Sequence, residues 1–362
     1  MQYKILIEML TCFFASFLLT YFIIPKIIGI AIYKQLMVKP NSRSSHVNQI
    51  PNLGGIAFYI TYMFGIYFLS KIYPINFSSA LTLSLLILFF VGLKDDLVIL
   101  SPITKLIAQS ISICIILFEP NFHITNLHGF FGIQEISTLI TLPISFLLML
   151  TIINAYNLID GIDGLAASIG IFIFSCLGVI FYSLNMNYEL GISLILIASL
   201  VAFLRYNMSV KSKIFMGDTG SLIIGFIIAA LIIRLLAIDE QTVNQLPFLP
   251  QNLLLVIISI LIVPLFDTIR VFFIRVLNGV SPLTADRNHI HHILIDYMKL
   301  SHRKSTFFIS IGNSLFTLLL INLCSFFNSF IILIVLIILV TMLVYLFNKM
   351  NFSNLKSKKN IN

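Results

Sequence analysis

The chain has 362 residues, of which 59% are hydrophobic and 10% are charged, and its mean hydropathy is +1.04. These values lie far outside the range of soluble globular proteins and exclude a soluble enzyme or binding module. The net charge of +8 does not indicate nucleic-acid binding, because the positions of the basic residues follow the membrane topology described below.

Apolar windows of about 17 to 21 residues recur along the whole chain, and each is long enough to cross a hydrocarbon core of ~30 Å. We expect about eleven of them, near 5-25, 53-70, 77-93, 103-118, 138-156, 165-184, 189-204, 219-238, 252-270, 306-326 and 329-347. The predicted fold is therefore all-α: one integral-membrane domain over 1-362, built as a polytopic helical bundle with broken helices at its cytoplasmic face.

The basic residues predict the orientation of this bundle. With the adjoining helix ends, the segments 31-52, 94-102, 157-164, 205-218, 271-305 and 348-362 hold every Lys and Arg except Lys4, Lys71 and Arg234. By the positive-inside rule they face the cytoplasm, with a basic tail at 348-362, a cytoplasmic C-terminus and an N-terminus on the outer side. The loop 119-137 then lies outside, and we expect its His123 and His128 to be solvated.

A polar stretch ends the fifth apolar window, where a membrane protein would ordinarily have none. Its polar residues recur every three positions: Asn154, Asn157, Asp160 and Asp163. On a straight helix the first and last would lie on opposite sides, so they converge only if the helix breaks, as Gly161 and Gly164 permit. Ionised groups at membrane depth are usually functional, and we interpret the stretch as the floor of an active site. A helix end with a simple Asp-Gly turn is the alternative.

Two adjacent carboxylates, Asp95 and Asp96, end the third window. Neighbouring carboxylates repel and are normally held together by a cation. Lys94 or Lys105 could be that cation, which would make the pair structural. Two Asp at a membrane face can equally hold Mg²⁺ or accept a proton.

Asp218 lies between Gly217 and the Thr219-Gly220-Ser221 run, at the predicted start of the eighth helix. Asp, Thr and Ser are ordinary helix caps, which gives a structural explanation. Free backbone N–H groups beside glycines also bind phosphate, and a carboxylate next to a phosphate usually shares a metal with it.

The largest predicted cytoplasmic loop contains Arg287 with His289, His291 and His292. Zinc is disfavoured, because no Cys or Glu partner and no metalloprotease spacing accompany the histidines. The cluster is better explained as hydrogen-bond donors for a pyrophosphate or for sugar hydroxyls. Upstream, Asp267 and Arg270 have the spacing of a simple intrahelical ion pair.

In this order, four motifs resemble the polyprenyl-phosphate N-acetylhexosamine-1-phosphate transferases, over roughly residues 34 to 292. The motifs are Asp95-Asp96, Asn-Ala-Tyr-Asn-Leu-Ile-Asp-Gly-Ile-Asp-Gly, Phe-Met-Gly-Asp-Thr-Gly-Ser and Asp-Arg-Asn-His-Ile-His-His. Ile290 interrupts the histidines, as in the N-acetylglucosamine-1-phosphate branch and unlike the muramoyl-pentapeptide branch. The catalytic loops would be 34-55, 94-105, 154-165, 205-221 and 271-305.

The resemblance implies a UDP-N-acetylhexosamine donor, an undecaprenyl phosphate acceptor, Mg²⁺ (with Mn²⁺ as a substitute), and release of UMP at the cytoplasmic face of a bacterial inner membrane. It implies catalytic roles for Asp95, Asp96 and Asp218, with Asp218 as the Mg²⁺ ligand and Asp95 as a second candidate ligand. Substrate binding would fall to Asn154, Asn157, Asp160, Asp163, Lys105, Arg287, His289, His291 and His292.

Two other interpretations stay open on the sequence alone. Another UDP-N-acetylhexosamine could be the donor, because a few hydrogen bonds decide between sugar epimers. A secondary transporter would also place Asp and Asn in broken helices, but it should show matching interruptions in two halves, which we do not find. The lipid bilayer is the expected partner, and a homodimer is a further option.

Overall fold

The computed structural model describes residues 2–37, 49–73, 77–120, 122–281 and 287–359, with side chains described up to Lys349. The predicted loops 34-55 and 271-305 are therefore described in part, because 38–48 and 282–286 lie outside the described residues. Residues 360–362 of the predicted basic tail also lie outside them.

Helices make up nearly all of the described chain. The first eight are α1 (Gln2–Tyr33), α2 (Gly54–Ile72), α3 (Ser78–Leu97), α4 (Pro102–Leu117), α5 (Thr138–Leu158), α6 (Leu165–Ser183), α7 (Asn187–Asn207) and α8 (Gly217–Leu236). The others are α9 (Glu240–Val243), the 3-10 helix η1 (Pro250–Asn252), α10 (Leu253–Ile260), α11 (Ile262–Leu277), α12 (Ile290–Met298), α13 (His302–Phe326) and α14 (Ser329–Lys359). The predicted helical bundle is confirmed.

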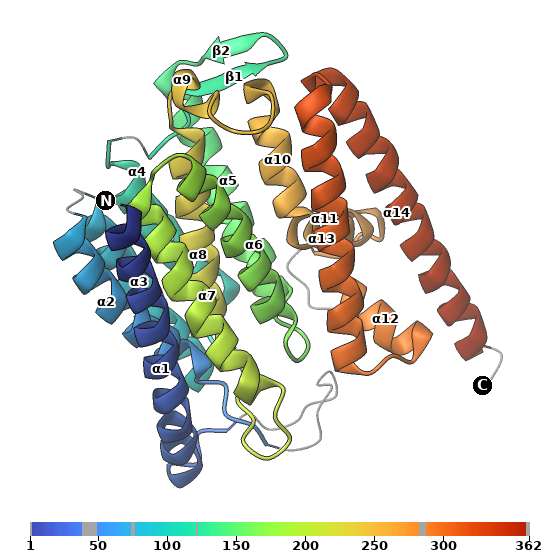
Figure 1. The fold of residues 1–362 in the computed structure, drawn as a ribbon. Helices are drawn as coiled ribbons and strands as arrows, with labels where there is room; N and C mark the ends of the chain where they lie inside the picture. Colours follow the sequence, from blue (N-terminus) through green and yellow to red (C-terminus); the bar gives the residue numbers. More distant parts are fainter. Residues whose placement is uncertain (1, 38–48, 74–76, 121, 282–286, 360–362) are drawn as a thin grey trace.

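Helix α8 is the centre of the bundle (Figure 1), and it packs against α2, α3 and α5. Its most apolar 18-residue window is 94% buried within the protein, compared with 28% for α13 and 11% for α14. The outer helices thus expose wide apolar surfaces, which are stable only in an apolar environment such as lipid.

The predicted apolar windows all fall on helices. Within the described residues, eight helices are long and apolar enough to cross a membrane, or nine if α10 and α11 form one bent span. Helix α4 is shorter, with 16 residues. It begins at Ser101, whose hydroxyl accepts the Thr104 N–H at 3.2 Å, and Pro102 follows at the first helical position.

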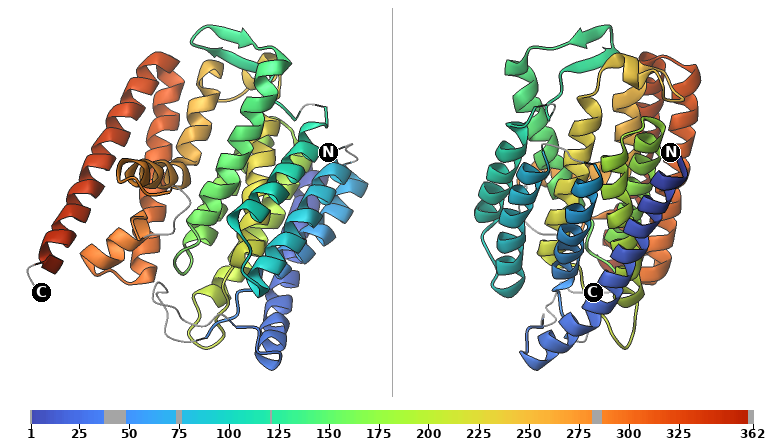
Figure 2. Two further views of the ribbon diagram at one scale, coloured as in Figure 1. Left: turned by 180° about the vertical axis from the view of Figure 1, so that it is seen from behind. Right: turned by 60° about the vertical axis from the view of Figure 1, so that its left-hand side comes forward.

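The span predicted at 252-270 is not one straight helix. The helix breaks at Leu261, and α11 is turned by 70° from α10, so that it crosses the bundle in Figure 2. Pro264 explains the break, because its ring has no N–H for the Ile260 carbonyl and clashes with it. Helix α11 buries Asp267 and Arg270 on one side and exposes Phe272 and Phe273 on the other.

A short hairpin occupies the predicted outer loop. Strand β1 (Asn126–Phe130) pairs antiparallel with β2 (Ile133–Glu135). The expectation that His128 is solvated is wrong: its side chain is 2% exposed, because η1 and α10 pack against β1. His123 is half-buried.

The loops predicted to be cytoplasmic lie at one end of the bundle. Figure 1 shows the α5–α6 turn, the α7–α8 loop and α12 at that end, and the hairpin at the other. The N-terminus and the C-terminus lie toward opposite ends. This arrangement agrees with the predicted topology, whose cytoplasmic assignment stays a prediction.

Candidate active site

The N-terminus of α8 is approached closely by α2 and α3. A Cβ atom at Gly92 of α3 would lie 2.5 Å from the Thr219 Cα atom, so only glycine allows this contact. Gly217, just before Asp218, has φ = +72°, and a Cβ atom there would overlap the Asn52 carbonyl oxygen. The glycines therefore bring the carboxylates at the end of α3 against the start of α8.

Asp96 is bonded to this helix start through both carboxylate oxygens. Its Oδ1 accepts the Asp218 N–H at 2.8 Å, and its Oδ2 accepts the Thr219 N–H at 3.1 Å and the Thr219 hydroxyl at 2.5 Å. The Asn52 amide also donates to Oδ1 at 3.1 Å. Asp96 thus caps α8 from a neighbouring helix, and its two carboxylate oxygens accept four hydrogen bonds.

Asp95 points the other way, toward Lys105 of α4. The Lys105 Nζ atom lies 2.7 Å from Asp95 Oδ2 and 2.8 Å from Asp218 Oδ2. The second oxygen of Asp95 accepts the Leu100 N–H at 2.6 Å, and that of Asp218 accepts the Asn157 amide at 2.6 Å. One ammonium group therefore joins two carboxylates from different helices.

The Asn154 to Leu165 stretch is broken, as predicted. Helix α5 ends at Leu158, and Gly164 (φ = +78°) immediately precedes α6. The Gly164 N–H donates to Asn207 Oδ1 at 2.6 Å, while the Asn207 amide donates to the Ile214 carbonyl at 2.8 Å. Asn207, which belongs to none of the sequence motifs, thus joins this turn to the loop that leads to Asp218.

The four polar residues of the stretch do not converge on one point. Asn157 reaches Asp218, whereas the Asn154 amide donates to Gln109 Oε1 at 2.8 Å and links α5 to α4. Asp163 turns toward Lys213, 2.5 Å away, and His302, 3.2 Å away. The prediction of a single converging set is therefore only partly right.

Asp160 and Asp163 lie in the turn between α5 and α6 and have opposite electrostatic environments. Burial of the Asp160 carboxyl, together with the negative charge of Asp218 and other nearby carboxylates, raises its pKa to about 7. Burial also opposes ionisation of Asp163, but hydrogen bonds from His302 and Lys213 outweigh it and lower the pKa of that carboxyl.

The histidine segment is held by Asp267 of α11, a role that the sequence did not indicate. Asp267 Oδ2 lies 2.9 Å from His289 Nδ1, and its Oδ1 accepts the Ile290 N–H at 2.9 Å. The predicted ion pair between Asp267 and Arg270 also forms, at 3.7 Å, and Arg270 donates to the Asn288 carbonyl. These contacts fix the start of α12.

His291 brings this segment to the polar stretch. A Cβ atom at Gly161 would overlap the His291 ring, so the two are in direct contact. Burial and the neighbouring His292 lower the pKa of His291 to about 3, and burial and Arg287 lower that of His292 to about 4. Both rings are neutral at pH 7 and offer one N–H donor each. Arg287 pairs with Asp296 at 3.0 Å.

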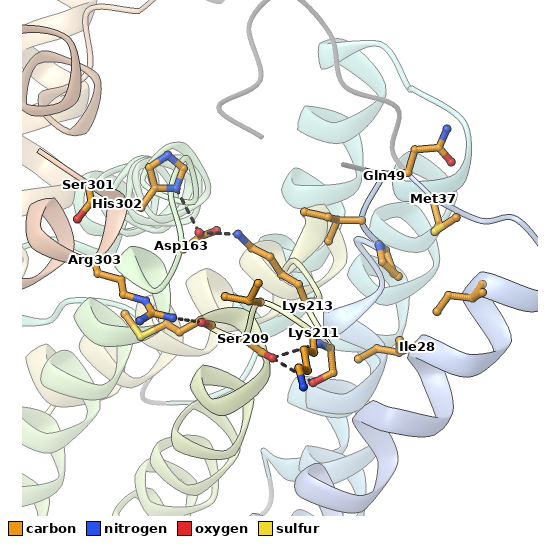
Figure 3. Close-up of a pocket in the computed structure, with 16 residues that line it drawn as sticks. Ile28, Met37, Gln49, Asp163, Ser209, Lys211, Lys213, Ser301, His302 and Arg303 are labelled. Atoms are coloured by element: carbon orange, nitrogen blue, oxygen red, sulfur yellow. Dashed lines mark hydrogen bonds and ion pairs between the residues drawn. The ribbon is translucent and has the colours of Figure 1, made fainter. Parts of the chain in front are cut away.

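A cavity of about 580 Å³ lies beside Asp163. Figure 3 shows Lys213 and His302 meeting at Asp163 on its wall, with Lys211 and Arg303 nearby. The Arg303 guanidinium donates to the Met208 carbonyl at 2.7 Å and so ties α13 to the α7–α8 loop. Lys211, Lys213 and Arg303 outnumber the one acidic residue, Asp163, in the lining of a cavity at the same end of the bundle as Asp218.

The model of glycosyl transferase family 4 matches residues 78–236. A probable undecaprenyl-phosphate N-acetylglucosaminyl 1-phosphate transferase of Bacillus subtilis is 33% identical over 321 residues, which are 86% of this chain and 84% of that protein. The chain belongs to glycosyl transferase family 4.

Further relatives of this family carry the name undecaprenyl-phosphate alpha-N-acetylglucosaminyl 1-phosphate transferase. The one from Escherichia coli (strain K12) is 30% identical over 271 residues, 72% of this chain and 69% of that protein. The one from Salmonella typhi is 28% identical over 275 residues, 74% of this chain and 71% of that protein. Membership of a transferase family decides against the secondary transporter considered above.

The geometry divides the predicted site residues of this family member into three groups. Five of them meet at the start of α8: Asp95, Asp96, Asp218, Lys105 and Asn157. Five others lie in the α5–α6 turn or at the start of α12: Asp160, Asp163, His289, His291 and His292. Asn154 and Arg287 bond to other protein side chains.

Among the described residues, no three Asp, Glu, His or Cys side chains cluster to hold a metal ion. Mg²⁺ does not need such a cluster, because it binds through one or two carboxylates together with water and phosphate oxygens. Asp95 and Asp218 each direct one oxygen to a common point, which is occupied by the Lys105 ammonium. A donor set of two converging carboxylate oxygens fits Mg²⁺ or Mn²⁺.

Proposed function

We propose that this protein transfers N-acetylglucosamine-1-phosphate from a UDP-sugar to undecaprenyl phosphate and releases UMP. This would be the first membrane step in the synthesis of a cell-envelope polysaccharide such as O-antigen, capsule or a wall polymer. The observation that carries the proposal is the meeting of Asp95, Lys105, Asn157 and Asp218 at the N-terminus of a buried helix. The names of the relatives support the acceptor and the transferred group.

The proposed reaction is one displacement. An oxygen of the lipid phosphate forms a bond to the phosphorus that carries the sugar, and the bond from that phosphorus to the bridging oxygen breaks. UMP leaves with the electron pair. The nucleophile and the diphosphate are both anions, so their approach has to be offset by positive charge. A Mg²⁺ ion held by Asp218 and Asp95 would supply Lewis-acid stabilisation of that charge.

The residues of the chain then have distinct proposed roles. Lys105 binds phosphate oxygens, and Asn157 holds the Asp218 carboxylate in its orientation. Asp95 faces the acceptor phosphate, whereas Asp96 positions the start of α8, because both its carboxylate oxygens accept hydrogen bonds from Asp218 or Thr219 there. His291 and His292 donate hydrogen bonds as neutral imidazoles.

We place the nucleotide in the basic cavity beside Asp163. Its volume of about 580 Å³ falls within the range of roughly 300–1,000 Å³ that small-molecule pockets have. Lys211, Lys213 and Arg303 line the cavity, so positive charge is available to the phosphate oxygens of a nucleotide. Asp160 lies in the same α5–α6 turn as Asp163, which lines this cavity. We propose that Asp160 contacts the ribose or the base.

The direct test is product formation with a panel of substrates. Membranes that contain the protein are incubated with undecaprenyl phosphate and radiolabelled UDP-N-acetylglucosamine, UDP-N-acetylgalactosamine or a deoxy analogue. We expect a labelled lipid with the first donor, one UMP per transfer, and no product in EDTA until Mg²⁺ or Mn²⁺ is added. Label from a different donor alone would correct the sugar, and no lipid product from any donor would refute the proposed reaction.

A second measurement separates one displacement from two. In delipidated enzyme, exchange of labelled UMP into UDP-sugar requires a sugar-phosphate bound covalently to the protein. We expect exchange only when undecaprenyl phosphate is present. Sustained exchange in its absence would rule out direct transfer.

We also propose that the protein resides in the bacterial inner membrane with the site facing the cytoplasm. The distribution of Lys and Arg supports this orientation, with a periplasmic N-terminus and a cytoplasmic C-terminus. In a cysteine-free background, an impermeant maleimide applied to intact cells should label Thr125→Cys but not Val210→Cys, which are exposed residues at opposite ends. The reverse pattern would invert the topology.

A further inference from the structure

The ammonium group of Lys105 occupies the point on which the Asp95 and Asp218 carboxylates converge. Its Nζ atom is 2.7 Å from Asp95 Oδ2 and 2.8 Å from Asp218 Oδ2. The other two oxygens of these carboxylates are bonded to the Leu100 N–H and to Asn157. The oxygens that face Lys105 are therefore the ones left for a cation.

Charge balance explains why a cation is needed there. Asp95, Asp96 and Asp218 gather around the start of α8, and neighbouring carboxylates repel unless positive charge lies between them. Asp96 is satisfied by backbone and hydroxyl donors, but Asp95 and Asp218 share Lys105. Without Lys105 or a metal ion, two partly buried carboxylates would face each other unneutralised, which is costly.

The ammonium group of Lys105 can move away from the two carboxylates without a change in the fold. Its backbone is fixed in the first turn of α4, where the Ser101 cap begins the helix. Its side chain has a flexible four-carbon stem and is 24% exposed, so the ammonium group can move while the helix stays in place. Asp95 is held by the Leu100 N–H and Asp218 by Asn157, so the carboxylates stay converged when Lys105 withdraws.

We propose that Lys105 is an internal competitor of the divalent cation: its ammonium holds Asp95 and Asp218 together in the cation-free protein and is displaced when Mg²⁺ or Mn²⁺ binds them. This inference rests on the metal requirement in the proposed function. Two cations cannot share one point, so metal binding releases Lys105 toward the phosphate oxygens of the substrates. The cation-binding step and the arrival of a phosphate-binding ammonium are thereby linked.

The competition predicts the direction of an affinity change. If Lys105 only bound substrate phosphates, its removal would leave cation affinity in the substrate-free protein almost unchanged. If it competes, its removal raises that affinity. We expect Lys105→Met to bind Mn²⁺ at least about tenfold more tightly than the wild type, which corresponds to about 1.4 kcal/mol.

The experiment measures Mn²⁺ binding to the purified full-length protein by the loss of the free-ion electron paramagnetic resonance signal, with no nucleotide or lipid phosphate added. Lys213→Met is the matched control, since Lys213 also pairs with an aspartate at this end of the bundle but does not contact Asp218. It removes the same charge, and its affinity for Mn²⁺ should stay within about threefold of the wild type.

Thermal unfolding provides the second measurement. In EDTA, Lys105→Met should melt below the wild type, and saturating Mn²⁺ should raise its midpoint by more than it raises that of Lys213→Met. If Lys105→Met does not fold without metal, Lys105→Gln, which keeps a polar group, is compared in its place.

The outcomes separate this inference from the proposed function. Affinity in Lys105→Met that is unchanged or weaker than in Lys213→Met would overturn the competition while leaving metal-dependent transfer intact. Mn²⁺ binding by neither the wild type nor Lys105→Met would overturn both the competition and the metal requirement. Tighter binding in Lys105→Met alone supports the inference.

Discussion

Two lysine–aspartate clusters lie at the same end of the bundle, and their charge balance differs. At the start of α8, Lys105 faces two carboxylates, and the carboxylate of Asp96 lies alongside. At the α5–α6 turn, Asp163 alone is held by Lys213 and His302. The first cluster has more carboxylates than cations among the described residues, whereas the second has at least as many cationic partners as carboxylates.

This difference indicates two uses of the same residue types. Excess negative charge that is partly buried is costly, so it is expected where a further cation or a cationic complex binds. The balanced cluster is satisfied within the protein, and it joins the α7–α8 loop, the α5–α6 turn and the start of α13. We therefore expect the first cluster to matter most for the chemical step and the second for holding the cavity in shape.

The largest expected effect tests this contrast directly. Asp218→Asn should reduce the rate of sugar-phosphate transfer by at least about 10³-fold, because it removes a negative ligand of the cation that stabilises the transition state. Asp163→Asn should reduce it by only about tenfold. Initial rates at saturating UDP-sugar and undecaprenyl phosphate give the comparison.

Both variants should insert and elute as the wild type does in size-exclusion chromatography. Equal losses of transfer rate in Asp163→Asn and Asp218→Asn would show that the first cluster is not more important for the chemical step than the second. Asp239→Asn is the matched control, because Asp239 caps α9 at the opposite end and Asn caps helices equally well. Its rate should stay within about twofold of the wild type.

The contact between the histidine segment and the polar stretch gives the next effect. Gly161→Ala places a methyl group where the His291 ring lies, and so it should push the ring out of the site. We expect transfer to fall by about 10²-fold, the scale of losing one donor to a developing anion. Gly29→Ala, where the added Cβ atom meets nothing within 4 Å, is the control. Activity retained in Gly161→Ala would show that His291 does not act from this position.

Much of the site could be predicted from the sequence, because the residues are close to motif glycines and lie at predicted helix ends. The break between α5 and α6 follows from Gly161 and Gly164, whereas the contact of Asn157 with Asp218 is seen only in the structure. The distinct roles of Asp95 and Asp96 could not be predicted. Adjacent helical residues point about 100° apart, so which one faces the site depends on how α3 is rotated against α8.

Other features of the site involve residues that the sequence shows but whose contacts can be recognised only in the folded structure. Pro264 indicates an interruption of the helix near Leu261. A proline alone does not show whether the helix ends there or continues with a bend. The bond between Asp267 and His289 joins residues 22 positions apart, and the charge on Arg270 offered a nearer partner. Asn207 and Lys213 carry no motif that distinguishes them from ordinary loop residues.

A smaller effect is expected at Asp267, which orients the histidine segment. Asp267→Asn keeps one acceptor oxygen for the Ile290 N–H but replaces the other with an amide that cannot accept from His289 Nδ1. We predict about a tenfold fall in kcat/KM for UDP-sugar with a smaller change in KM for undecaprenyl phosphate. An equal change for both substrates would indicate a general loss of structure instead of a misplaced His289.

The smallest effect concerns the stability of the histidine segment as a function of pH. His291 is neutral in the folded protein, with a pKa lowered to about 3, whereas an unfolded histidine has a pKa of about 6.5. Between these values the unfolded chain binds a proton that the folded chain does not. Stability is therefore fully present above pH 6.5 and falls as the pH falls toward 3, by about 2 kcal/mol at pH 5.

His291→Gln removes this titration while keeping a hydrogen-bond donor. The melting midpoint of the variant, measured in EDTA from pH 8 to pH 5, should lose several degrees less than that of the wild type, so that the two curves approach or cross as the pH falls. Gly29→Ala, which introduces no titratable group, should run parallel to the wild type. Parallel curves for His291→Gln as well would mean that water reaches the His291 ring in the folded protein. The ring would then not be packed against Gly161, and the histidine segment would not contact the α5–α6 turn. In that case Gly161→Ala would not be expected to lose activity.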